Sequence, residues 1–244
     1  MGAVAIDTSL KKRFGLYEAY IGKKLVMAVT GVVLFGYVIG HLAGNLQIYI
    51  PPRVVDGQYV YPINNYARFL HSNPAALWAV RTLLLAAVFL HIWSALQLWL
   101  QKRRARPVGY YKKDDVPSAY ASRTMMWSGP ILAAFIVFHI LHLTTGSVGL
   151  GFREAEAGEF YAFQNLVHGF RHPAVAIAYI VAIVLLSMHL YHGIWSMFQS
   201  VGISHPRWTP VIKRFAHWFA ILIAAGYISI PLAVLARVVG SEVP

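Results

Sequence analysis

Long apolar runs alternate with short polar connections along the whole chain. Five runs of about 20 residues or more, nearly free of charge, extend roughly over 24–49, 75–100, 125–150, 173–199 and 215–239. An α-helix of this length crosses the hydrocarbon core of a bilayer, which is about 30 Å thick. The pattern predicts an all-α integral membrane protein: one domain, residues 1–244, with five transmembrane helices.

The composition supports this class and narrows the chemistry. Hydrophobic residues make up 58% of the chain and charged residues only 12%, too apolar a balance for a soluble domain. Because the first 23 residues are polar or amphipathic, we expect the first run to be a retained span rather than a signal peptide. The chain has no cysteine, so iron–sulfur, zinc-thiolate and disulfide chemistry are excluded, and a metal must bind to histidine, carboxylate or thioether.

The positive charge, +12 in total, is concentrated before the first run and in the second and fourth connections. The positive-inside rule places these segments, and the amino terminus, on the cytoplasmic side. They suit a cytoplasmic partner or acidic lipid head groups, so nucleic acid is not needed to explain the charge. The residues are Lys11, Lys12, Arg13, Lys23, Lys24, Lys102, Arg103, Arg104, Arg106, Lys112, Lys113, Arg123, Arg207, Lys213 and Arg214.

Four histidines inside the predicted spans fall at two matched depths. An ionisable side chain in hydrocarbon is costly and marks a functional site. At about 1.5 Å per residue, His41 and His139 lie roughly 25 Å from the cytoplasmic boundary, whereas His91 and His189 lie roughly 15 to 17 Å from it. Taken singly, each histidine is also explained by a hydrogen bond to a neighbouring helix; the shared depths favour pairs.

Paired histidines on facing helices are the axial ligands that haem b requires. We predict that the first four spans form a bundle around two haems. His41 and His139 would bind the outer iron, and His91 and His189 the inner iron. An iron with two imidazole ligands has no open position, which suits electron transfer better than oxygen chemistry.

Three further residues are candidates for contacts around these haems. His142 and His192 each follow a proposed ligand by one helical turn; they are alternative ligands, or contacts to a propionate or a quinone. Arg81 lies inside the second run and suits an outer propionate or a quinone oxygen, although snorkelling to the interface also explains it.

The outer connections 59–73 and 159–172 mix aromatic and polar residues, which predicts short interfacial helices. Two interpretations of the first connection remain open: a quinone site beside the outer haem, or a structural cap over the haem edge. The hydrogen-bonding residues concerned are Asn64, Asn65, Tyr66, Arg68 and His71.

The spacing of several residues is similar to that of one known family. These residues are the segment His189-Leu-Tyr-His-Gly-Ile-Trp-Ser196 followed by Gly202, Arg123 and Gly129 before His139, His41 followed by Leu42, and His91 late in the second run. Over nearly its whole length the chain resembles the single-chain, five-helix, di-haem cytochrome b anchor of succinate dehydrogenase and fumarate reductase.

The resemblance implies a multi-pass subunit of the bacterial cytoplasmic membrane. Electrons from succinate would arrive through a flavoprotein with FAD and an iron–sulfur subunit, and would pass from the inner to the outer haem and on to menaquinone or another quinone. The subunit would share in the enzyme's quinone reaction but not in succinate oxidation, and its complex is a candidate for a higher oligomer. The carboxylate that some fumarate reductases use near the distal quinone has no evident counterpart, Asp56 being the nearest acid.

Two other classes of protein fit part of the pattern. A haem b subunit of a hydrogenase, a formate dehydrogenase or a ferric reductase would also hold haems between paired histidines. A haem-free transporter would use membrane histidines to relay protons. A structural anchor that lost its haems fits less well, because all four ligand histidines are present.

Overall fold

The fold is described from a computed structural model, which covers residues 20–105, 120–149 and 151–241. Part of the predicted cytoplasmic charge, namely Lys11, Lys12, Arg13, Arg106, Lys112 and Lys113, lies outside the described residues, as does position 150, the predicted end of the third span.

Five long helices account for most of the described chain. They are α1 (Tyr20–Asn45), extended by the 3-10 helix η1 (Leu46–Tyr49), α3 (Pro74–Ala105), α4 (Tyr120–Leu143), α6 (Pro173–Ser200) and α7 (Thr209–Leu235). Each contains a stretch long and apolar enough to cross a membrane. The prediction of a mostly helical, multi-pass membrane protein is therefore confirmed.

The third and fifth spans differ most from the sequence prediction. The third span ends at Leu143 rather than 150. The N–H groups of Thr144 and Thr145 both bond to the Ile140 carbonyl, and the chain then turns at Gly146, whose φ of 69° is left-handed. The fifth helix runs from Thr209 to Leu235 rather than over 215–239. Pro210 in its first turn favours helix initiation. A hydropathy average detects neither this proline nor the turn at Gly146.

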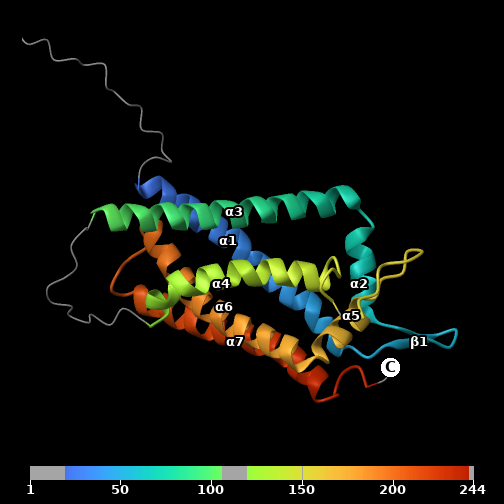
Figure 1. Ribbon diagram of the computed structural model, residues 1–244. Helices are drawn as coiled ribbons and strands as arrows, with labels where there is room; N and C mark the ends of the chain where they lie inside the picture. Colours follow the sequence, from blue (N-terminus) through green and yellow to red (C-terminus); the bar gives the residue numbers. More distant parts are fainter. Residues whose placement is uncertain (1–19, 106–119, 150, 242–244) are drawn as a thin grey trace, which may run out of the picture.

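The long helices associate in pairs. Helix α1 packs along α3 and α4 packs along α6, while α7 lies against α6 and also contacts α1 (Figure 1). The first four spans thus form two helix pairs, α1/α3 and α4/α6, joined through α1 and α6. Any group held between α1 and α4, or between α3 and α6, lies between these two pairs.

One end of the bundle carries short elements that we call the cap: helices α2 (Pro62–His71) and α5 (Ala162–Phe170), and the antiparallel strands β1 (Arg53–Val55) and β2 (Gln58–Val60) (Figure 1). The two predicted short helices are therefore present. The cap shares one core with η1 and the adjoining ends of α6 and α7; in this core Tyr61 stacks on Phe163 with ring centres 3.9 Å apart, and Val167 is fully buried.

The sequence analysis missed the hairpin between β1 and β2. Asp56 and Gly57 occupy its turn with φ values of 50° and 77°. Two successive residues with positive φ are typical of a type I′ turn, for which Asp-Gly is a preferred pair. The Asp-Gly dipeptide, flanked by β-branched and aromatic residues, is the sequence signal for this hairpin.

Candidate functional site

The structure brings the four histidines at matched depth together in two pairs. The rings of His41 on α1 and His139 on α4, the outer pair, have centres 5.7 Å apart and planes inclined by 87°. The rings of His91 on α3 and His189 on α6, the inner pair, have centres 6.2 Å apart and planes inclined by 57°. Each pair therefore connects helix pair α1/α3 with helix pair α4/α6.

The separation of the rings is compatible with two imidazoles on opposite sides of one metal ion. An imidazole nitrogen binds such an ion at about 2 Å and the ring centre lies about 1 Å farther, so the two centres should be about 6 Å apart. Within the described residues there is no group of three or more histidine, aspartate or glutamate side chains that would hold a metal ion by itself. Two imidazoles with nothing else fit the iron of a haem, since the porphyrin supplies the remaining four ligands.

Thr30 favours one tautomer of His91. The buried Thr30 hydroxyl donates its only proton to a carbonyl of its own helix, with Val26 O at 2.8 Å and Met27 O at 3.1 Å. With that proton used, the Thr30 oxygen, 3.2 Å from His91 Nδ1, is an acceptor, which favours the tautomer of His91 with the proton on Nδ1. The lone pair of Nε2 is left for a metal ion, as in metal sites where a second residue orients the ligand.

His189 and His192, one turn apart on α6, have different surroundings. His189 faces His91, and its Nδ1 is buried without a hydrogen-bond partner. His192 instead meets Trp195 edge to face, with ring centres 5.5 Å apart. His192 Nδ1 and Trp195 Nε1 are likewise buried without partners, so both are available to a propionate.

Tyrosines surround the outer pair. Tyr37 stacks on His41 at 5.2 Å, with its hydroxyl 3.5 Å from His41 Nδ1, and the ring centre of Tyr227 lies 6.2 Å from that of His41. On the other side, the hydroxyl of Tyr179 lies 3.2 Å from His139 Nδ1. The outer pair therefore has more hydroxyl neighbours than the inner pair.

His142 is directed towards the cap rather than towards His41. Its ring is only 3% exposed and stacks on Phe138 with centres 5.5 Å apart. It also lies close to α5, since a Cβ added at Gly169 would be 2.6 Å from His142 Cε1. This position suits a packing and hydrogen-bonding role better than an iron ligand.

The candidates for a quinone site on α2 contact neighbouring residues of the outer connections and of α2 itself. Arg68 Nε donates to Gly158 O at 3.2 Å, and His71 Nδ1 lies 2.8 Å from the Ala67 carbonyl of its own helix, with its ring against Phe160. The side chain of Asn65 is exposed. These contacts favour the interpretation of α2 as a structural cap.

Two other polar residues of the predicted site also have defined positions. Asn64 links the cap helices, because its Oδ1 accepts the Phe163 N–H at 2.8 Å and its Nδ2 donates to Gln164 at 3.1 Å. Arg81 lies over the ring of Trp78, 5.2 Å from its centre and one turn away on the same helix. This contact is also compatible with snorkelling towards the interface.

Comparison of the chain with protein-family models, with curated proteins and with solved structures gives no match. The geometry therefore carries the functional interpretation. Sequence reasoning missed Thr30 and Tyr179: each is a hydroxyl inside an apolar run, but their partners lie on other helices.

Proposed function

We propose that this chain is the di-haem cytochrome b anchor subunit of a succinate:quinone oxidoreductase. The observation that carries the proposal is the presence of two histidine pairs, with ring centres 5.7 Å and 6.2 Å apart, each joining one helix pair to the other. The resemblance in the spacing of these histidines supplies the class of enzyme.

When bound, the two haems would supply one-electron transfer, and the residues of this chain hold and orient them. His41 and His139 would hold the outer haem and His91 and His189 the inner haem, and Thr30 would favour the tautomer of His91 whose Nε2 lone pair is free. All four rings are at most partly exposed even without lipid around the bundle, which limits access of water to the irons.

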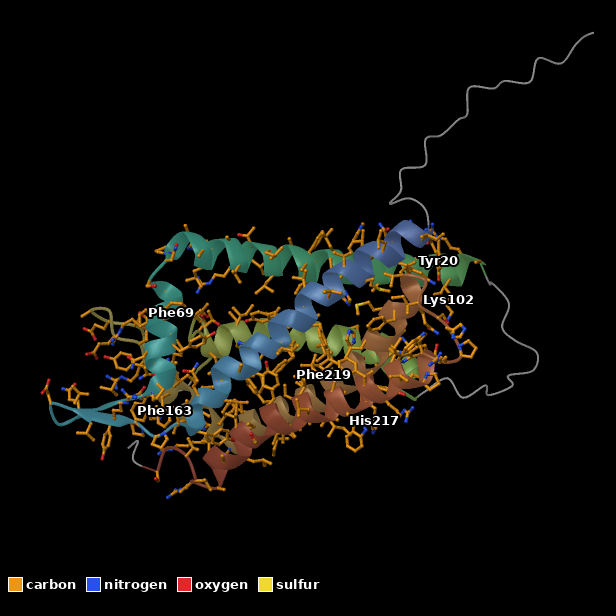
Figure 2. All side chains as sticks on the ribbon, turned by 180° about the vertical axis from the view of Figure 1, so that it is seen from behind. Tyr20, Phe69, Lys102, Phe163, His217 and Phe219 are labelled. Carbon is orange, nitrogen blue, oxygen red and sulfur yellow. The ribbon has the colours of Figure 1, made fainter. Side chains whose placement is uncertain are left out.

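The two ends of the bundle differ in charge, which supports one orientation of the chain in the membrane. Tyr20 and Lys102 lie at one end, whereas Phe69 and Phe163 of the cap lie at the other (Figure 2). Lys102, Arg103 and Arg104 form the last turn of α3 at the basic end. We assign this end to the cytoplasm, where it would receive an iron–sulfur subunit that is itself reduced by a flavoprotein with FAD. Electrons would then pass through the inner and outer haems to menaquinone or another quinone.

The first experiment is to purify the chain with its partners from the native membrane and to measure haem per polypeptide. Two b haems with a sharp α band in the reduced-minus-oxidised spectrum are expected, together with a copurifying flavoprotein and succinate:quinone activity. A colourless protein would instead indicate the haem-free transporter and refute the proposal.

The same histidine geometry also serves a haem b subunit of a hydrogenase, a formate dehydrogenase or a ferric reductase. The copurifying partner separates these functions. A nickel or molybdenum enzyme in place of the flavoprotein would agree with two bound haems, but the electrons would then come from a substrate other than succinate.

A further inference from the structure

Tyr179 is held rigidly at the outer pair. It lies near the start of α6, is 6% exposed, and meets the rings of Phe135, Phe138 and Phe170 edge to face, with centres 4.9, 5.9 and 4.9 Å away. Because these rings enclose the phenol, the position of its hydroxyl is determined by packing. The hydroxyl lies 3.2 Å from His139 Nδ1 and 2.9 Å from His142 Nδ1.

The number of available protons restricts the tautomers of His139 and His142. A phenol has one proton to donate and can accept through its oxygen. Tyr179 satisfies both hydrogen bonds when one histidine donates its Nδ1 proton and the other accepts the phenol proton. When the phenol also uses its own proton in one of the two bonds, neutral His139 and His142 are opposite tautomers, and only the donor has an Nε2 lone pair free for a metal ion.

The packing identifies the donor. His139 faces His41 across the helix pairs, with ring centres 5.7 Å apart. His142 Nε2 lies against the backbone of α5, since a Cβ at Gly169 would be 2.8 Å from it. This arrangement favours His139 as the donor of Nδ1–H to the Tyr179 oxygen, with the Tyr179 hydroxyl donating to His142 Nδ1.

We propose that Tyr179, supported by His142, is a positioning residue that holds His139 in the iron-binding tautomer and lowers the midpoint potential of the outer haem. The inference rests on the proposed di-haem function. An imidazole that donates its distal N–H to an acceptor becomes a stronger electron donor to iron, which favours the ferric state. The inner pair is independent of this system, because His91 Nδ1 lies beside the Thr30 hydroxyl instead.

The test is a redox titration of both haems in the purified complex that carries Tyr179→Phe. This variant keeps the ring and its packing but removes the acceptor, so the potential of the outer haem should rise while that of the inner haem stays unchanged. The matched control is Tyr227→Phe, since Tyr227 also lies near the outer pair but its hydroxyl donates to Val38 O at 2.8 Å. The control should move neither potential.

A second pair of variants keeps the inference testable if Tyr179→Phe does not assemble. His142→Leu removes the acceptor for the phenol proton, whereas His142→Asn retains one close to the position of Nδ1. We expect His142→Leu to raise the outer potential, by less than Tyr179→Phe, and His142→Asn to restore most of the difference.

The outcomes separate this inference from the function on which it rests. Wild-type complex without two b haems overturns both. Two haems with an outer potential that neither Tyr179→Phe nor His142→Leu raises overturn the role of Tyr179 alone. Loss of the outer haem in His142→Ala with retention in His139→Ala reverses the assigned tautomers and also overturns it.

Discussion

The strongest prediction concerns the pattern in which haem is lost when the paired histidines are replaced. The ring centres in each pair are 5.7 Å and 6.2 Å apart, close to the value of about 6 Å expected for two imidazoles on one iron. Both members of a pair should therefore serve the same haem. Replacing either one removes one of two axial ligands and, with it, that haem.

The expected magnitudes follow from this sharing. His41→Ala and His139→Ala should each halve the haem content, and so should the double variant, because the second substitution acts on a haem already lost. His41→Ala combined with His91→Ala should instead remove all haem. Such dependence within a pair and independence between pairs is the signature of coupled residues.

Haem should be measured as pyridine haemochrome per polypeptide in complexes purified under identical conditions, with a redox titration to identify the haem that remains. A matched control is His217→Ala, because His217 is also a histidine in a spanning helix but is exposed, and its ring neighbours are Tyr191 and Trp218. This variant should keep both haems.

Two results would refute the reasoning. If the His41→Ala, His139→Ala double variant loses all haem, the two rings serve different haems. If His192→Ala removes the inner haem and His189→Ala does not, the ligand on α6 lies one turn further along.

Three further predictions concern the cap. Gly169→Ala places a Cβ 2.6 Å from His142 Cε1, so the free energy of unfolding, measured by thermal unfolding, should fall by about 1 to 3 kcal/mol. Asn64→Ala leaves the Phe163 N–H without its 2.8 Å acceptor. The free energy of unfolding should fall by about 1 to 3 kcal/mol, and proteolysis of the cap should become faster. Burial, followed by nearby arginines, lowers the pKa of His168 in the folded state. The unfolded chain then binds the proton more readily, so stability falls as pH drops below about 6.5; His168→Gln should lessen this fall in thermal unfolding at neutral and mildly acidic pH.

Parts of the fold were open to prediction because they depend on local signals. Hydropathy predicts all five spans, and the mixed aromatic and polar connections predict α2 and α5. The end of α4 at Leu143 was missed because the residues beyond it are still moderately apolar, while the turn at Gly146 depends on backbone conformation. The hairpin at Asp56 and Gly57 was missed for a different reason, because its signal is a turn dipeptide that hydropathy does not detect.

The sequence by itself determined the membrane class of the protein and predicted the relative height of each histidine along its helix. Depth along a helix follows from a constant rise per residue, and charge indicates which end faces the cytoplasm. Only the tertiary structure decided which ring faces which, because that depends on the rotation of each helix and on its neighbours. Thr30 and Tyr179 show the same limit: a hydroxyl in an apolar run is visible in the sequence, but its role depends on the nitrogen that another helix places beside it.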